Sequence, residues 1–220
     1  MSGGKLSPLQ WRILRILAPL QPRWVLTGGG ALAGVYLKHR PTRDLDLFWR
    51  GRDQLDPLPR EVDARLRAAG LTVETLQSGV TFHRFRVSDN ADACALDLVA
   101  EHAPSIEAPI TVQMDHVEIL VDSRQEVLVN KLCALLGRCE LRDLQDVKAL
   151  IDAGSSLDRA LAEAPRKDGG FSPLTLAWVL EQFQVRVVAQ ALGWGVEETD
   201  ELVHFHAWLI ERLTAAGAPE

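Results

Sequence analysis

Acidic residues with the spacing of metal ligands occur at two places in the first half of the chain. Asp44 and Asp46 lie two residues apart in the run DLDLFW, and Asp97 is the single acid in the apolar run CALDLVA. Residues two apart on a strand face the same side, with Cα atoms about 6.6 Å apart. Neighbouring carboxylates repel each other, and a hard cation such as Mg²⁺ or Mn²⁺ removes that cost. The spacing predicts a divalent-metal site on these three acids, of a kind that promotes phosphoryl displacement. The alternative is that Asp97 pairs with an arginine of a neighbouring strand, Arg84 or Arg86.

Three consecutive glycines precede these acids and suggest an anion site. Gly28, Gly29 and Gly30 follow the apolar run WVLT and open a segment with helical spacing. Glycines let a phosphate approach the backbone closely, and N–H groups at a helix start attract anions. Residues 21–52 carry six Lys and Arg, Arg43 among them, against two Asp, a local charge of +4 in a chain of net charge −6. We expect a polyphosphate here, although a solvated basic surface would give the same count.

A dinucleotide-binding motif is a rival interpretation of the same glycines. The run from Gly28 to Ala33 fits G-x-G-x-x-A, and Asp46 follows Gly28 by 18 residues. In that fold the acid ends a buried apolar strand. Here the residues before Asp44 are HRPTR, which cannot form a buried strand, so the pattern disfavours a dinucleotide site.

A second group of charged residues lies in the C-terminal half. Lys131 falls in the middle of an apolar helical stripe that includes Val127 and Leu135, where it needs either a partner such as a phosphate or a route to solvent. Asp143 and Asp146 are neighbours on the next predicted helix, within reach of Arg142. From the pattern alone, an ordinary surface ion pair at a helix start is favoured for these acids.

The elements that must position these residues divide near residue 122. Strands are predicted at 23–27, 44–49, 71–76, 80–87, 94–100 and 116–121, with helices after Ser7, at 30–38 and at 61–69. Beyond Ser123 only helices are predicted, at 124–137, 142–152, 156–164, 173–192 and 196–215. We therefore expect a mixed α/β (α+β) domain over 1–122 and a helical domain over 123–220.

The composition indicates an ordinary globular protein. Its 220 residues are 47% hydrophobic and 25% charged, which excludes a disordered chain. We expect no membrane span, because no segment is long and apolar enough, and we expect no secretory signal, because the first residues lack a charged segment followed by an apolar one. Three cysteines without a CxxC pair make a disulfide framework or zinc knuckle improbable and fit a cytoplasmic protein.

The run TGGGALAGVYLKHRPTRDLDLF resembles the AbiEii/AbiGii-type nucleotidyltransferase toxin family, within the polymerase-β-like superfamily. The resemblance continues through NKLCALLGRCELRDLQD, residues 130–146. It implies a nucleotidyltransferase fold with a mixed sheet and flanking helices, and a helical domain that closes the active-site cleft. It also implies that Gly28 and Gly29 hold a triphosphate, that Lys131 reaches phosphate and that Asp143 is a catalytic or positioning acid supported by Asp146. Gly30 departs from the threonine or serine of many members.

The resemblance further implies a metal-dependent enzyme that moves NMP from an NTP to an acceptor hydroxyl, with tRNA as a candidate acceptor. An antitoxin protein is the implied partner, because many members are toxins of two-gene pairs. Two alternatives stay open: a non-catalytic nucleotide- or protein-binding module on the same fold, and a small-molecule nucleotidyltransferase. The acidic remainder of the chain, with a net charge of −10 outside residues 21–52, would suit a cationic small molecule.

Overall fold

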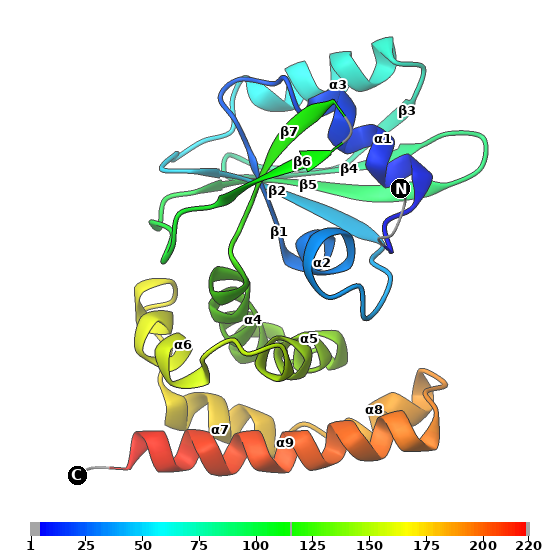
Figure 1. Cartoon of the computed structure of the whole chain (residues 1–220). Coiled ribbons are helices and arrows are strands. Elements are labelled where there is room, and N and C mark those ends of the chain that lie inside the picture. The colour runs from blue at the N-terminus through cyan, green and yellow to red at the C-terminus, as the bar shows by residue number, and fades with distance from the viewer. Residues whose placement is uncertain (1–4, 115, 219–220) are drawn as a thin grey trace. The chain divides into compact units, whose positions relative to one another are not determined.

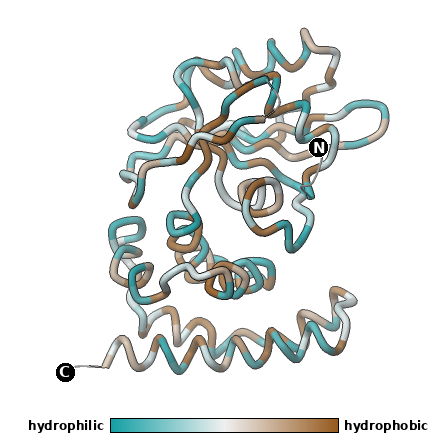
Figure 2. Tube along the Cα trace, in the orientation of Figure 1, coloured by the Kyte–Doolittle hydropathy of each residue, from teal (hydrophilic) through white to brown (hydrophobic). Residues whose placement is uncertain are grey.

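The computed structural model describes residues 5–114 and 116–218, and the chain divides into two compact units, Met1–Ser123 and Arg124–Glu220 (Figure 1). The first unit contains a sheet with helices, and the second contains helices. Figure 2 shows hydrophobic residues along the central strands of the first unit, which are buried, whereas many connecting loops are hydrophilic.

The sheet of the first unit has seven strands and mixed pairing. Its strands are β1 (Val25–Thr27), β2 (Asp44–Arg50), β3 (Thr72–Ser78), β4 (Phe82–Ser88), β5 (Ala93–Glu101), β6 (Ile110–Met114) and β7 (Val117–Val121). They lie in the order β3-β4-β5-β2-β1-β7-β6. The pairs β2–β5 and β1–β7 are parallel and the others antiparallel. The predicted mixed α/β fold is confirmed.

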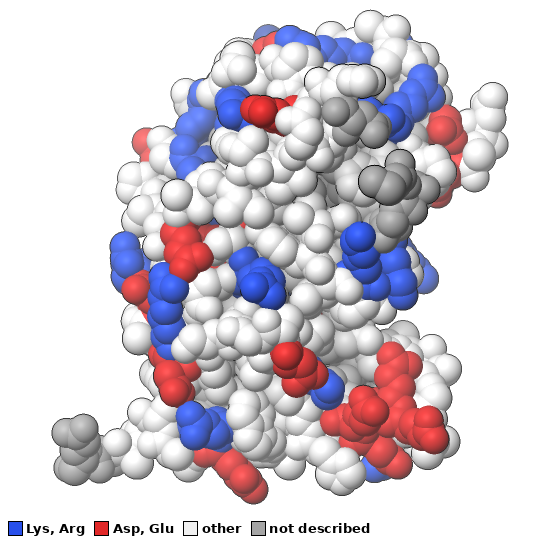
Figure 3. Space-filling view, viewed as in Figure 1, with Lys and Arg blue, Asp and Glu red and all other residues white. Residues whose placement is uncertain are grey.

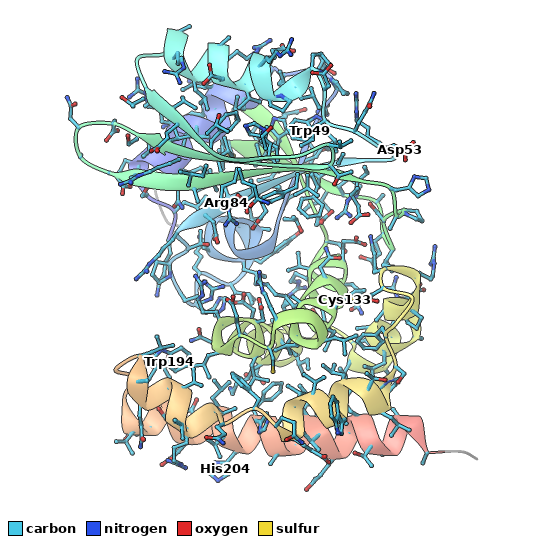
Figure 4. The ribbon with its side chains drawn as sticks, turned by 180° about the vertical axis from the view of Figure 1, so that it is seen from behind. Trp49, Asp53, Arg84, Cys133, Trp194 and His204 are labelled. Atoms are coloured by element: carbon cyan, nitrogen blue, oxygen red, sulfur yellow. The ribbon has the colours of Figure 1, made fainter. Side chains whose placement is uncertain are left out.

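Alternation along β2 separates a core face from a polar face. Leu45, Leu47 and Trp49 are at most 1% exposed, whereas the acids between them are partly exposed. Helices α1 (Pro8–Leu17) and α3 (Leu58–Ala68) lie over the apolar face (Figure 1). Figure 4 shows Trp49 on the side of α3 and Arg84 on the opposite side of the sheet. The period of two predicted this division.

The glycine segment forms a short helix that widens at once. Helix α2 (Gly28–Ala31) continues as a π-helix, η1 (Leu32–Tyr36). The Tyr36 hydroxyl donates to the Asp122 carbonyl at 2.7 Å and ties the end of η1 to the chain after β7. The sequence predicted one helix over 30–38, and the structure begins it two residues earlier and ends it in a different helical form.

The second unit is helical, as predicted. Its helices are α4 (Arg124–Arg138), α5 (Leu141–Asp152), α6 (Leu157–Glu163), a 3₁₀ turn (Ala164–Arg166), α7 (Pro173–Glu181), α8 (Val185–Ala191) and α9 (Val196–Gly217). Ser172 caps α7 by accepting from the Thr175 N–H, and Pro173 follows it, as the sequence indicated.

Two element predictions were wrong. The single helix expected over 173–192 is interrupted after Glu181, because the buried residues Leu180 and Val185 are five apart and cannot share one helical face. Strand β6 was not expected, because it is an edge strand with most residues exposed and shows no clear alternation.

Charge is distributed unevenly between the two units. Residues 1–123 contain 14 Lys and Arg against 15 Asp and Glu, whereas residues 124–220 contain 10 against 15. The helical unit therefore carries −5 of the net −6. Figure 3 shows acidic side chains gathered over the start of α9, where Glu197 and Glu198 lie in the first turn. No helix of the described residues is long and apolar enough to cross a membrane.

Candidate active site

Four strands place a row of polar side chains across the face of the sheet opposite α3. Thr27 of β1 lies opposite Asp46 of β2, Asp46 lies beside Asp97 of β5, and Asp97 lies opposite Arg84 of β4. Residues in register on neighbouring strands point to the same face. Asp44, two residues before Asp46, faces the same way. The structure thus brings the three acids of the sequence prediction onto one face.

The first two glycines of the turn lie against side-chain oxygens of Asp46, in this row, and of Thr42, just before β2. Gly28 has a φ of +58°, and a Cβ there would lie 2.5 Å from Asp46 Oδ2. A Cβ at Gly29 would lie 2.6 Å from Thr42 Oγ1. Real Cβ atoms do not approach other atoms so closely, so a side chain at either position would push the Asp46 or Thr42 side chain aside. The turn therefore brings the backbone directly beside the Asp46 carboxylate.

Gly30 is placed differently. A Cβ at this position would lie 2.9 Å from Leu26 Cδ1 and 3.2 Å from Leu45 Cδ2. Packing against the apolar core accounts for this glycine without a ligand. Its predicted contact with nucleotide stays a prediction.

The segment before β2 places two further side chains near the glycine turn, those of Thr42 and Arg40. The Thr42 hydroxyl donates to Asp44 Oδ1 at 2.6 Å and so orients that carboxylate. Arg40 Nη2 lies 3.6 Å from the Cβ position of Gly29. Arg43, the predicted nucleotide-binding residue of this segment, is exposed just before β2. Of the two arginines, Arg40 is the one that lies beside the glycine turn.

Asp97 is bound in a two-point ion pair with Arg84. Arg84 Nε donates to Oδ1 at 2.7 Å and Nη2 donates to Oδ2 at 2.5 Å. The hydrogen bond to Asp97 is the largest cause that raises the pKa of Arg84; burial opposes it, and the charges of Asp97, Asp44 and Asp46 add to it. Of the two readings of Asp97 from sequence, the arginine pair is therefore present, and its partner is Arg84.

The oxygens of this face fit a hard cation in part. Asp44 and Asp46 offer carboxylates on one face, as Mg²⁺ or Mn²⁺ prefers. The buried Thr27 hydroxyl beside Asp46 has no hydrogen-bond partner among the described residues, which is the environment of a group that meets a ligand. Both Asp97 oxygens are engaged by Arg84, and within the described ranges no three His, Cys, Asp or Glu side chains are grouped to hold a metal ion.

In the helical unit, Lys131 forms a buried cluster with two acids. Lys131 Nζ lies 2.8 Å from Asp143 Oδ1 and 2.8 Å from Asp146 Oδ2, and the side chains are 9%, 1% and 0% exposed. Arg138 also donates to both oxygens of Asp143, at 2.7 and 2.9 Å. The favoured interpretation of Asp143 and Asp146 as surface acids was wrong. Arg142 pairs instead with Glu140 at 3.4 Å.

Burial and pairing act in opposite directions within this cluster. Burial raises the pKa of Asp143, but hydrogen bonds from Arg138 and the charge and hydrogen bond of Lys131 outweigh it and hold the pKa below its usual value. Burial lowers the pKa of Lys131, but the charges of Asp146 and Asp143 outweigh it and leave the pKa raised. Lys131 is therefore a buried cation, and its predicted contact with phosphate stays a prediction.

Comparison with known proteins identifies the family. The model of the AbiEii toxin family, a nucleotidyl transferase of a type IV toxin–antitoxin system, matches residues 12–191. The chain belongs to the AbiEii nucleotidyl transferase toxin family. The matched range includes the glycine turn, the three strand acids and the Lys131 cluster of this AbiEii-family chain.

Two solved structures share the fold of the AbiEii-family chain. MenT4, a nucleotidyltransferase toxin from Mycobacterium tuberculosis, gives a TM-score of 0.59 at 15% identity, over 96% of this chain and 82% of its own. JHP933 from Helicobacter pylori gives a TM-score of 0.52 at 20% identity, over 92% of this chain and 89% of its own. No curated protein sequence matches the chain. The resemblance seen in the sequence is confirmed for family and fold.

Proposed function

We propose that this AbiEii-family chain transfers NMP from an NTP to an acceptor hydroxyl, with Asp44 and Asp46 holding the divalent metal. One observation carries the proposal: the two carboxylates share a face beside a glycine turn, and the Asp46 oxygen is so close that a Cβ at position 28 would have to displace it. Acids grouped beside a glycine turn suit a divalent metal ion with a triphosphate.

The proposed reaction is a displacement at the α-phosphorus. The acceptor oxygen forms a bond to the α-phosphorus, the bond to the bridging oxygen of the β-phosphate breaks, and pyrophosphate leaves with that oxygen. The proton of the acceptor hydroxyl passes to a carboxylate of the site. Mg²⁺ or Mn²⁺, when bound, supplies charge neutralisation for the phosphate oxygens.

The chain's own residues orient these groups. The hydrogen bond from Thr42 fixes one Asp44 oxygen, so the other oxygen keeps a constant direction. The absent side chains of Gly28 and Gly29 let the Asp46 and Thr42 oxygens lie against the turn, and Arg40 adds positive charge beside Gly29. The proposed role of the two glycines in holding the triphosphate rests on the family motif. The proposal includes two further roles that rest on the family motif. Lys131 binds phosphate, and Asp143 acts in catalysis with Asp146 in support.

The proposed acceptor and the proposed protein partner rest on family membership alone. We infer that the acceptor hydroxyl belongs to an RNA, with tRNA as the first candidate, and that an antitoxin protein restrains the enzyme. An NTP substrate and three free thiols fit a cytoplasmic enzyme.

The test is transfer of label from each α-³²P-NTP to total tRNA in Mg²⁺. We expect label in RNA with the natural chain, and a loss of at least about 100-fold for Asp44→Asn and for Asp46→Asn, because each removes a charge that orients phosphate. Asp53→Asn is the matched control, since Asp53 is 82% exposed and its Oδ1 lies 2.7 Å from His102 Nδ1. Full transfer by Asp44→Asn would refute the proposal, and nucleotide binding without product would favour a non-catalytic module.

A further inference from the structure

Arg84 is held in place more firmly than its exposure suggests. Its side chain is 42% exposed, yet two of its nitrogens are fixed on Asp97, which is 7% exposed. On its other side the guanidinium carbon lies 5.5 Å from the centre of the Phe82 ring, within the range of a cation–π contact. A guanidinium fixed by both a carboxylate and a ring has few other orientations available.

The remaining edge of the guanidinium has no hydrogen-bond acceptor within the part of the chain that the structure describes. Only Nε and Nη2 bond to Asp97, and no described residue accepts a hydrogen bond from Nη1. This edge stands on the face that carries Asp44 and Asp46, and both acids act on Arg84 electrostatically. A guanidinium edge that is not engaged by the protein binds phosphate oxygens well, because the guanidinium is planar and always charged.

The pairing of Asp97 with Arg84 agrees with a single metal ion. Of the three acids of this face, Asp97 has its charge balanced by Arg84. A second ion would have to displace Arg84 from Asp97, since both Asp97 oxygens are already engaged.

We propose that Arg84, oriented by Asp97, is the second cation of this site, so that the chain binds one divalent metal ion on Asp44 and Asp46 and a phosphate oxygen of the NTP on the open guanidinium edge. This rests on the proposed function. Asp97 is then a positioning residue that acts through Arg84, and it is not a metal ligand.

Direct metal binding separates the roles of the three acids. Mn²⁺ bound to the nucleotide-free full chain is counted by electron paramagnetic resonance. We expect one site in the natural chain, weakened at least tenfold by Asp44→Asn and changed less than threefold by Asp97→Asn. In Arg84→Gln the freed Asp97 should admit a second Mn²⁺. Two sites in the natural chain, or a tenfold weakening by Asp97→Asn, would overturn the proposal.

Nucleotide affinity tests the open edge. Each of the four α,β-methylene NTP analogues is titrated in Mn²⁺ against Arg84→Gln, Arg84→Lys and Asp97→Asn. We expect the affinity to fall about 10- to 100-fold for Arg84→Gln and to fall also for Asp97→Asn, as for loss of a charged hydrogen bond. Arg84→Lys keeps the charge and the single Mn²⁺, and should lie between the natural chain and Arg84→Gln. It also provides a folded variant if Arg84→Gln is unstable.

Arg86→Gln is the matched control for both measurements. Arg86 lies two residues along β4 on the same face, but it stands opposite Ala95 instead of an acid. It should change neither Mn²⁺ count nor affinity. An equal loss in Arg86→Gln would mean that general positive charge, and not the fixed edge, binds phosphate. If Asp44→Asn left Mn²⁺ binding intact, both this proposal and the proposed function would fail, whereas an effect of Asp97→Asn on Mn²⁺ would remove only this one.

Discussion

The Thr27 hydroxyl is a buried polar group at the end of β1. The residue is 3% exposed and precedes α2 in extended conformation, yet its hydroxyl forms no cap hydrogen bond and has no partner among the described residues. An unsatisfied buried hydroxyl costs about 1–3 kcal/mol. Proteins retain such groups mainly where a ligand or water completes them.

We expect Thr27→Val to reduce NMP transfer about tenfold while the free energy of unfolding changes by less than about 1 kcal/mol or rises, because no protein hydrogen bond is lost. Chemical denaturation and the tRNA labelling assay measure the two quantities. Thr111→Val, at an exposed position of β6, is the control. A loss of stability above about 2 kcal/mol would show that the hydroxyl is bonded within the protein.

The turn from β1 into α2 is set by contacts that a glycine alone permits. Gly28 combines a positive φ with the Asp46 oxygen at its missing Cβ, whereas Gly51 has a φ of +68° and open space around it. The two positions therefore separate backbone strain from steric collision.

Gly51→Ala should destabilise the protein by about 1 kcal/mol and leave transfer unchanged, because only backbone strain is added. Gly28→Ala should add a collision to that strain, displace Asp46 and reduce transfer at least about 100-fold. Thermal unfolding and the labelling assay provide the comparison. Equal behaviour of the two variants would show that Asp46 moves aside without consequence.

Helices α4 and α5 are joined by the Lys131 cluster. Because the folded pKa of Asp143 lies below its usual value of about 3.9, the ion pair contributes stability above that pH and loses it as the pH falls through the folded value. Removal of the lysine leaves two buried acids without this cation.

We expect Lys131→Met to cost about 3–5 kcal/mol at pH 7 and less at pH 4, where the buried acids can take up protons. Denaturant unfolding at both pH values measures this. Lys148→Met, which breaks the exposed pair with Asp152 on α5, should cost less than about 1 kcal/mol at either pH. A penalty for Lys131→Met that is independent of pH would contradict the electrostatic explanation.

The three cysteine thiols are divided between the two units, so their labelling can follow the unfolding of each unit. Cys94 lies in the sheet unit, and Cys133 and Cys139 lie in the helical unit. Burial raises the pKa of Cys94 to about 12 and the pKa values of Cys133 and Cys139 to about 11. At neutral pH the reactive thiolate of each is therefore scarce.

A thiol reagent at pH 7.5 should label the native chain far more slowly than a free cysteine peptide, and should label all three positions after guanidinium unfolding. Mass spectrometry of the labelled peptides identifies each position along a denaturant series. Rapid native labelling of Cys94 would contradict its burial at 2% exposure. Because each unit contains a reporter, the same series measures the order in which the two units unfold.

Local sequence determined much of this protein. The glycine turn, the alternation that puts Asp44 and Asp46 on one face, the capped start of α7 and the mixed α/β fold were all predicted, because each depends on residues close together in the chain. The family could be identified for the same reason, since its motifs are continuous runs.

Only the tertiary structure decided which groups meet. Arg84 pairs with Asp97 because β4 and β5 are neighbours in a particular register, and Asp143 is buried because α5 packs on the helix that carries Lys131. Such pairings depend on strand order and helix packing, which the spacing of residues along the chain does not encode. The single acid in an apolar strand could be recognised from sequence, but its partner could not.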